Sequence, residues 1–197
     1  MSPEHTTPHP LVLASTSPRR KVLLETLGLA FEVWEAALDE RLSPGEGPAL
    51  AVARLAVAKA EAGARAHPGA AVLGADTLVA LGERPLGKPQ DAADARAMLR
   101  LLSGRVHQVW TAVALARLGH ETLQRTARSE VTFRDISDLE ILTYVDTGEP
   151  LDKAGAYAIQ GRAAAFVTQL AGARDTVVGL PLAETCELLR AVGIALP

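Results

Sequence analysis

Short apolar runs alternate with amphipathic stretches along this chain. The run Leu11–Ala14 predicts a buried strand, because no polar residue interrupts it. We expect a helix to begin at Pro18, with Ser17 as its N-cap, and to end at Gly28. The polar leader, residues 1–10, is predicted to be a flexible tail, and residues 11–197 to form a single domain.

The pattern continues over the rest of the chain. Further strands are predicted at 31–34, 71–81, 107–116, 122–133 and 165–170, and further helices at 48–66, 91–103, 137–148 and 181–193. The turn around Gly119 joins two long β-prone runs into an antiparallel hairpin. Because βα units and a hairpin occur in one chain, the fold class is predicted as α/β, a mixed sheet flanked by helices. A cleft between two lobes is the natural place for a site.

The first turn of the helix after Leu11–Ala14 carries unusual charge. Arg19, Arg20 and Lys21 lie at the helix end that normally favours acidic residues. One interpretation is a solvated basic turn; the other is an anion site in which backbone N–H groups, serine hydroxyls and guanidinium groups bind phosphate. The hydroxyl-rich loop before the helix favours the anion site, although the chain has no Walker or G-x-G-x-x-G motif.

Two further charges fall within apolar patterns. Asp76 interrupts the run VLGADTLVAL, where a carboxylate is costly unless it is paired or binds a metal. The alternative is a structural turn aspartate. Lys59 lies on the apolar face of the helix predicted at 48–66, where it either extends to the surface or points into a polar cleft.

Composition narrows the class of protein. Of the 197 residues 48% are hydrophobic, 4% are aromatic, and the net charge is −3, so neither nucleic acid nor an anionic membrane is an expected partner. The one cysteine, Cys186, excludes an intrachain disulfide and favours a reducing compartment, the cytoplasm. No apolar run approaches the length of a membrane span.

The charged residues together suggest phosphoryl chemistry. Such chemistry uses cations to neutralise phosphate oxygens and carboxylates to hold a divalent ion. The candidate acids and lysines are Glu40, Asp76, Asp152, Lys59, Lys88 and Lys153. Oxygen ligands of this kind suit Mg²⁺ or Mn²⁺. The residues alone therefore predict a metal-dependent hydrolase of phosphate esters or nucleotides.

Five short motifs occur in order, and together they resemble the Maf family of nucleoside triphosphate pyrophosphatases. They are S-x-S-P-R-R from Ser15, G-A-D-T from Gly74, G-K-P from Gly87, D-K-A-G-A-Y from Asp152 and G-L-P from Gly179. The resemblance implies an elongated mixed sheet with a central cleft, similar to the inosine-triphosphate pyrophosphatases. It also implies metal-dependent hydrolysis of a nucleoside triphosphate to monophosphate and pyrophosphate, and a possible homodimer.

The resemblance also assigns site residues. Asp76 would be the catalytic base, with Lys59 and Lys88 beside it, and Glu40 and Asp76 would hold the metal. Asp39 is an alternative to Glu40. The substrate-binding residues would be Ser15, Arg19, Arg20, Thr77, Lys153 and Gln160.

The family divides by base preference, and three positions place this chain. Arg19, Thr77 and Gln160 match the branch that acts on dTTP and UTP, whereas the 7-methyl-GTP branch tends to carry Trp, Gln and Glu there. A glutamine amide both donates and accepts, which suits the edge of uracil or thymine. Modified pyrimidine nucleotides remain open as substrates. A binding or regulatory role in septum formation is the alternative from another class, but a pure binder would not need Asp76.

Overall fold

The computed structural model describes residues 10–43 and 45–197, so the predicted tail lies almost wholly outside it. The strands are β1 (Leu11–Ala14), β2 (Phe31–Val33), β3 (Ala71–Leu81), β4 (Arg84–Leu86), β5 (Val106–Ala116), β6 (Leu123–Phe133) and β7 (Val167–Ala171). The α-helices are α1 (Pro18–Glu25), α2 (Pro48–Ala66), α3 (Ala92–Leu102), α4 (Asp138–Val145), α5 (Arg174–Val178) and α6 (Leu182–Ala191). Three 3₁₀ turns are η1 (Glu149–Asp152), η2 (Ala154–Ala156) and η3 (Arg162–Phe166).

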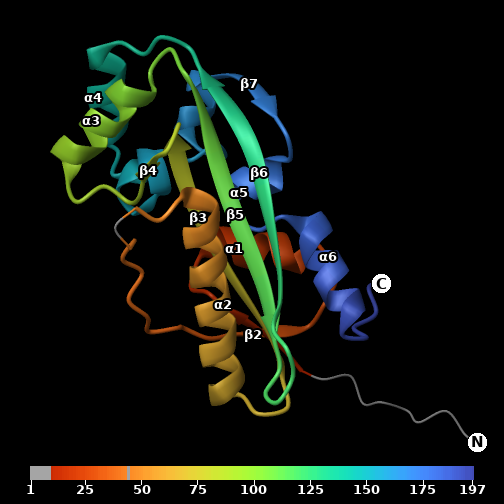
Figure 1. The fold of residues 1–197 in the computed structure, drawn as a ribbon. Coiled ribbons are helices and arrows are strands. Elements are labelled where there is room, and N and C mark those ends of the chain that lie inside the picture. Colours follow the sequence, from red (N-terminus) through yellow and green to blue (C-terminus); the bar gives the residue numbers. More distant parts are fainter. Residues whose placement is uncertain (1–9, 44) are drawn as a thin grey trace, which may run out of the picture.

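The strands form one seven-stranded mixed sheet in the order β2-β1-β3-β5-β6-β7, with β4 paired to β3 (Figure 1). β1 is parallel to both β2 and β3, and the remaining pairs are antiparallel. β5 and β6 make the expected long hairpin. The predicted mixed sheet flanked by helices is therefore confirmed.

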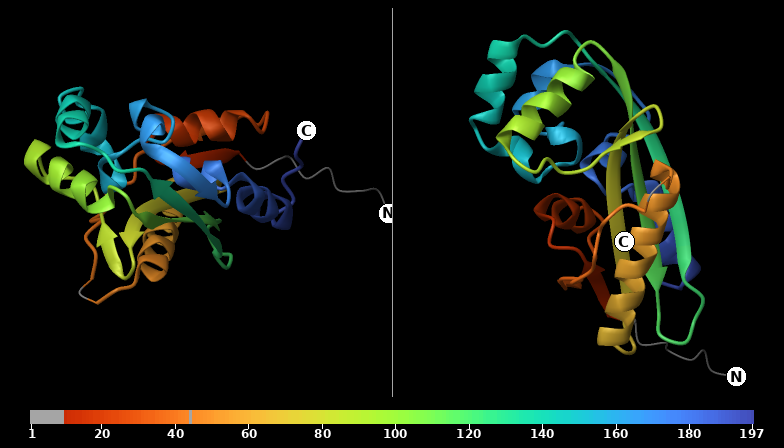
Figure 2. Two further views of the ribbon diagram at one scale, coloured as in Figure 1. Left: turned by 90° about the horizontal axis from the view of Figure 1, so that it is seen from above. Right: turned by 60° about the vertical axis from the view of Figure 1, so that its left-hand side comes forward.

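Helices cover both faces of the sheet (Figure 2). Alternate residues of a strand point to opposite faces, so Val12 and Val72 pack in the cluster formed with α2. Leu13 and Leu73 lie in the other cluster, which contains residues of α1 and α6. Both faces are apolar here, which explains why β1 reads as a continuous apolar run rather than as an alternating one.

α2 approaches β3 closely because small residues line the contact. A Cβ atom at Gly74 would lie 2.3 Å from the backbone oxygen of Ala56 and 2.6 Å from the backbone nitrogen of Ala60. Only glycine fits at this point of β3. The close contact sets the position of Lys59, which lies on α2 between these two alanines in sequence.

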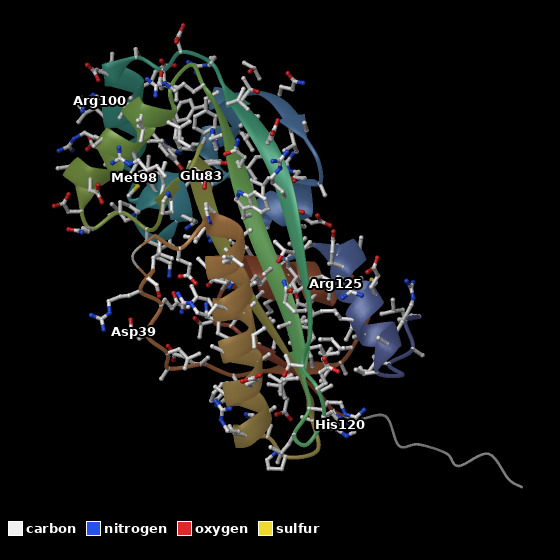
Figure 3. All side chains as sticks on the ribbon, viewed as in Figure 1. Asp39, Glu83, Met98, Arg100, His120 and Arg125 are labelled. Atoms are coloured by element: carbon white, nitrogen blue, oxygen red, sulfur yellow. The ribbon has the colours of Figure 1, made fainter. Side chains whose placement is uncertain are left out.

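A second lobe surrounds the far ends of β3, β5 and β6. Its core combines α3, α4 and the 3₁₀ turns and includes Leu99, Ile141 and an edge-to-face pair of Phe133 and Tyr157 with ring centroids 4.9 Å apart. Charged side chains, such as that of Arg100 on α3, lie on the outer surface of this lobe (Figure 3). The two lobes expected from the sequence are therefore present.

The predicted N-cap position of α1 is confirmed without its capping bond, one strand begins later than expected, and the short elements β4 and α5 were not predicted. Ser17 occupies the N-cap position of α1 without a side-chain capping bond; its N–H donates instead to Oγ of Ser15 (3.3 Å). The strand expected at 165–170 begins later, because the 3₁₀ turn η3 first buries Phe166. Helix α5 was not predicted, since five residues are too few for a periodic apolar pattern. Within the described residues, no helix has the length and apolar character needed to cross a membrane.

Candidate active site

A cleft opens beside the stretch of β3 that lies between its pairing with β1 and its pairing with β4. β1 pairs with β3 as far as Gly74, and β4 pairs with the same edge only from Val79 onward. Helices α1 and α2, which follow β1 and β2, pack in clusters on opposite faces of the sheet. In sheets of this kind, ligands bind outside the carboxyl ends of the strands where the connections change sides.

The cleft has a volume of about 760 Å³, and residues from both lobes line it. The structure brings all ten residues assigned from the sequence to its walls: Ser15, Arg19, Arg20, Glu40, Lys59, Asp76, Thr77, Lys88, Lys153 and Gln160. Lys21 is not among the lining residues; it forms an exposed ion pair with Glu25 one turn along α1 (3.8 Å). Two of the three cations at the helix start therefore face the cleft.

Lys59 joins two carboxylates at one side of the cleft. Its ammonium donates to Oδ1 of Asp76 (2.7 Å) and lies 2.6 Å from Oε1 of Glu40. Lys59 and Asp76 are buried, with 5% and 7% of their surfaces exposed. The Lys59 side chain was expected either to extend to the surface or to point into a polar cleft, and in the structure it points into the cleft. Asp76 is likewise paired in the cleft rather than placed in a turn.

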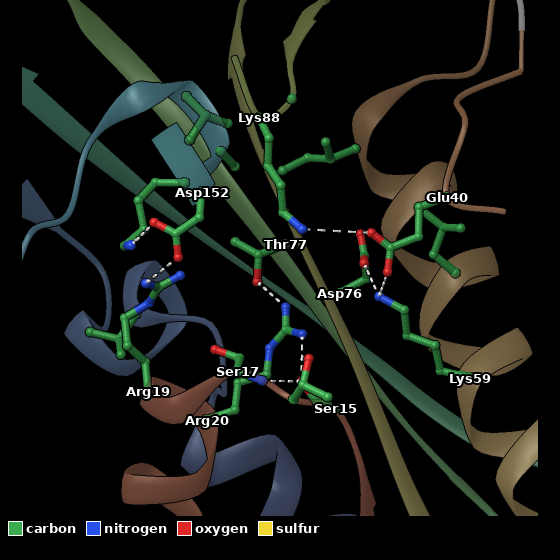
Figure 4. Close-up of a pocket in the computed structure, with 18 of the residues that line it drawn as sticks. Ser15, Ser17, Arg19, Arg20, Glu40, Lys59, Asp76, Thr77, Lys88 and Asp152 are labelled. Carbon is green, nitrogen blue, oxygen red and sulfur yellow. Dashed lines mark hydrogen bonds and ion pairs between the residues drawn. The ribbon is translucent and has the colours of Figure 1, made fainter. Parts of the chain in front are cut away.

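Glu40 and Asp39 point to different surroundings. Glu40 faces the cleft, where Lys88 lies 3.9 Å from its second oxygen (Figure 4). Burial alone raises the pKa of Glu40, but the hydrogen bond and charge of Lys59, with Lys88 and Arg20, lower it below its ordinary value. Asp39 instead pairs with the exposed Arg41 (2.6 Å) on the loop before α2 (Figure 3).

Arg20 enters the cleft from α1 and is fixed on three sides. Nε donates to the carbonyl of Gly179 (2.8 Å), Nη1 to Oγ of Ser15 (3.2 Å) and Nη2 to Oγ1 of Thr77 (3.1 Å). None of these partners is a carboxylate. Burial lowers the pKa of Arg20, while the charges of Asp76 and Glu40 act in the opposite direction. An arginine held by neutral groups keeps its positive charge available to an anion.

The far lobe contributes another charged group. Arg19 lies 3.9 Å from Asp152, which also pairs with Lys153 (Figure 4). Burial raises the pKa of Asp152, but Lys153 and Arg19 outweigh it and lower the value overall. After Lys153 the chain turns through Gly155 and Ala156, both with positive φ, and a Cβ at Gly155 would touch the side chain of Val79 at 2.9 Å.

Tyr157 lines the cleft, and behind it lies a partner, His107, that the sequence analysis missed. The hydroxyl of Tyr157 shares a hydrogen bond with Nε2 of His107 (2.9 Å). Burial raises the pKa of Tyr157 and lowers that of His107 to about 4, so both groups are neutral at pH 7. His107 lies in a β-prone run, and nothing in that run signals its contact with Tyr157, fifty positions away.

The charged side chains of the cleft are suited to binding a polyanion. Cations from both lobes surround the cleft, and two carboxylates converge on one point, where the Lys59 ammonium lies in this structure. Among the described residues, no three His, Cys, Asp or Glu side chains gather into a ready metal site. A divalent ion bound by two carboxylates would complete its shell with phosphate oxygens and water, as Mg²⁺ usually does. The residues fit such an ion.

Comparison with known proteins identifies the family. The family model described as Maf-like protein matches residues 10–192. A relative from Anaeromyxobacter dehalogenans strain 2CP-1, named dTTP/UTP pyrophosphatase, is 56% identical over 95% of this chain and 96% of its own. A relative of the same name from Myxococcus xanthus is 54% identical over 95% of this chain and 94% of its own. The solved Staphylococcus aureus Ham1 protein shows a weaker likeness, with 15% identity, a TM-score of 0.46 and coverage of 92% and 96%. Four of its five motifs line one cleft, the fifth contacts Arg20 through the carbonyl of Gly179, and a family model matches nearly its whole length, so this chain belongs to the Maf family.

Proposed function

We propose that this protein hydrolyses nucleoside triphosphates, with dTTP and UTP preferred, to the nucleoside monophosphate and pyrophosphate. The observation that carries the proposal is the buried Lys59–Asp76 pair in a cleft that Arg20 also enters. A site that only bound nucleotide would need the cations, but not a carboxylate inside an apolar strand. The names of the relatives from A. dehalogenans and M. xanthus support the choice of substrates.

In this proposal the cations hold the triphosphate. Arg20 and the Ser15 hydroxyl bind phosphate oxygens at the end of β1, and Lys88 binds them from the opposite lobe. Charge-assisted hydrogen bonds of this kind are the strong ones, and the half-buried guanidinium of Arg20, held by three hydrogen bonds, forms them with fixed geometry. The triphosphate is thereby held across the cleft with its α-phosphorus near Asp76.

Asp76 then acts as the general base. Its carboxylate takes a proton from water, whose oxygen bonds to the α-phosphorus. The bond from that phosphorus to the bridging oxygen breaks, and the electron pair leaves with pyrophosphate. Lys59 donates to Asp76 and keeps the carboxylate oriented, and with Lys88 it offsets the charge that develops on the phosphate oxygens.

Glu40 and Asp76 are the residues that would hold a divalent ion, Mg²⁺ or Mn²⁺. Their oxygens converge on the position of the Lys59 ammonium, a point already built for positive charge. When bound, the ion neutralises phosphate oxygens and lowers the pKa of a bound water.

We assign the nucleobase to the part of the cleft lined by Arg19, Gln160 and Lys153. Arg19, Thr77 and Gln160 are the three positions that match the dTTP/UTP branch, and all line the same cavity, with Lys153 beside them. The Gln160 amide can donate and accept at the same time, as the edge of uracil or thymine requires.

Cys186 is free, which agrees with a reducing compartment, and we place the reaction in the cytoplasm. A homodimer stays a prediction.

A panel of nucleotides tests the proposal. The full-length protein is assayed for pyrophosphate release from dTTP, UTP, CTP, ATP, GTP and 7-methyl-GTP, with Mg²⁺ and with Mn²⁺. We expect kcat/KM for dTTP and UTP to exceed that for every other nucleotide by at least about tenfold. Faster hydrolysis of 7-methyl-GTP would contradict the assignment of Arg19, Thr77 and Gln160. The absence of pyrophosphate with every nucleotide would contradict the enzyme itself.

A further inference from the structure

Behind Arg20, hydroxyl groups from two strands form a line that ends at a backbone carbonyl. Nη2 of Arg20 donates to Oγ1 of Thr77 (3.1 Å), and this oxygen lies 3.0 Å from Oγ1 of Thr111. Oγ1 of Thr111 donates to the carbonyl of Thr176 (2.7 Å). Thr111 and Thr176 are 0% and 1% exposed, and neither lines the cleft.

The direction of every bond in this line is fixed. A threonine hydroxyl has one hydrogen to donate. Thr111 uses its hydrogen on the carbonyl of Thr176, so it accepts from Thr77. Thr77 uses its hydrogen on Thr111 and accepts from Arg20. The Thr77 hydroxyl therefore has no hydrogen left for a carbonyl of the substrate.

The same line fixes the guanidinium of Arg20. An arginine carries five N–H groups, one on Nε and two on each terminal nitrogen. Contacts with Gly179, Ser15 and Thr77 use one on each nitrogen. One N–H therefore remains on Nη1 and one on Nη2. Two such groups on one planar fork can bind two oxygens of the same phosphate.

We infer that Thr111 is a positioning residue, which orients Arg20 through Thr77 so that its two remaining N–H groups face the polyphosphate of the substrate. The inference rests on the proposed function only in taking a polyphosphate as the ligand of Arg20. Sheet register supports the arrangement, because Thr77 and Thr111 are direct partners on the antiparallel strands β3 and β5. In such a pair, the two side chains lie on the same face of the sheet and close together. Thr77 accordingly acts on phosphate binding through Arg20 rather than by contact with the base.

Thr111→Val removes one hydroxyl from this line with little change in side-chain shape. Without an acceptor at position 111, the Thr77 hydroxyl rotates and no longer presents a fixed lone pair to Arg20. We expect the dissociation constant for a polyphosphate to rise about three- to tenfold, the usual effect of losing one neutral hydrogen bond. Thr111→Ser keeps the hydroxyl and should restore binding to within about twofold of the wild type.

Thr185→Val provides the matched control. Thr185 is also 0% exposed, and its hydroxyl also donates to a backbone carbonyl at 2.7 Å, that of Pro181. It lies on α6 and does not line the cleft. Its replacement tests what the loss of a buried threonine hydroxyl does to the protein in general.

The experiment is calorimetric titration of the four full-length proteins with inorganic tripolyphosphate, in metal-free buffer with EDTA, so that no turnover is involved. Weaker binding by Thr111→Val alone, with Thr111→Ser and Thr185→Val near the wild type, is the expected result. Equal affinity of Thr111→Val and the wild type would overturn the inference, as would equal loss in Thr111→Val and Thr185→Val or failure of the wild type to bind.

Kinetics with dTTP supply the second measurement. Thr111→Val should raise KM by the same factor and leave kcat within about twofold, because Arg20 binds substrate and transition state alike. A fall in kcat with unchanged KM would contradict a positioning role in binding. Wild-type protein that binds tripolyphosphate but hydrolyses no nucleotide would contradict the proposed function and leave the role of Thr111 intact.

Discussion

Asp76 is an acid buried within an apolar strand and paired with a lysine. It is 7% exposed, and its charge is paired directly with Lys59 inside the cleft. Burial of an acid in a strand costs free energy, and a purely structural role would be served as well by an apolar residue. The sequence already pointed to this residue through its interruption of an apolar run. The structure adds the partners, Lys59 and Glu40, which come from segments distant in sequence.

Asp76→Asn should abolish turnover while the protein stays folded. An amide cannot take the proton of the attacking water, and loss of a general base typically lowers kcat by about 10²–10⁴. The measurement is kcat for dTTP, with circular dichroism to show that the fold is retained. Asp39→Asn is the control, because Asp39 pairs with the exposed Arg41 and should change kcat by less than about twofold. A folded Asp76→Asn variant with wild-type kcat would mean that Asp76 is structural.

At the scale of elements, the site depends on how closely α2 approaches β3. Gly74 stands two residues before Asp76 on the same face of β3, and Ala56 and Ala60 flank Lys59 in the sequence of α2. The ends of α2 follow from the sequence, since Pro48 begins the helix and the apolar face runs to Ala66. Its distance from the sheet does not, because a single sequence does not indicate which glycine meets which backbone.

Gly74→Ala should therefore weaken both stability and activity. The new methyl group would push α2 away from β3 and separate Lys59 from Asp76. Overpacking of this kind costs about 1–3 kcal/mol of unfolding free energy, measured by urea denaturation, and kcat should fall in parallel. Gly47→Ala is the control, since a Cβ there meets no atom within 4 Å and the φ of Gly47 is −68°. Equal stability of the two variants would contradict the close contact.

The capping box of α4 gives a prediction about pH. Glu140 accepts from Arg134 and from the N–H and hydroxyl of Ser137, and the hydrogen bond from Arg134 above all lowers its pKa from 4.5 to about 2. A carboxylate whose pKa is lower in the folded state contributes stability above its unfolded pKa, and loses it as the pH falls through the folded pKa. The contribution of Glu140 is therefore complete above about pH 4.5 and disappears towards pH 2.

Glu140→Gln removes that contribution but retains a residue able to cap. Its urea midpoint should lie below that of the wild type at pH 7, and the difference should shrink from pH 4.5 to pH 2. Midpoints at pH 7, 4.5, 3 and 2 provide the measurement. A difference of the same size at pH 7 and pH 2 would show that the ionic interaction with Arg134 is not its source.

For the whole molecule, local signals predicted the elements, and motifs predicted the residues of the cleft. Turn-forming proline and glycine residues predicted where α2 begins, and the capping box predicted where α4 begins. A central cleft was expected, but its position could not be predicted, because it depends on where β1 stops and β4 begins along one edge of β3. Thr111 gave no signal either, since a threonine in a β-prone run is ordinary. Its contacts with Thr77 and Thr176 arise only from the pairing of β3 with β5 and the packing of α5.

The central claim is that water attacks the α-phosphorus of a pyrimidine nucleoside triphosphate in this cleft. Hydrolysis of dTTP in ¹⁸O-labelled water, followed by mass spectrometry of the products, tests it most directly. We expect one ¹⁸O atom in dTMP and unlabelled pyrophosphate. Label in orthophosphate with accumulation of dTDP, or label in pyrophosphate, would contradict it.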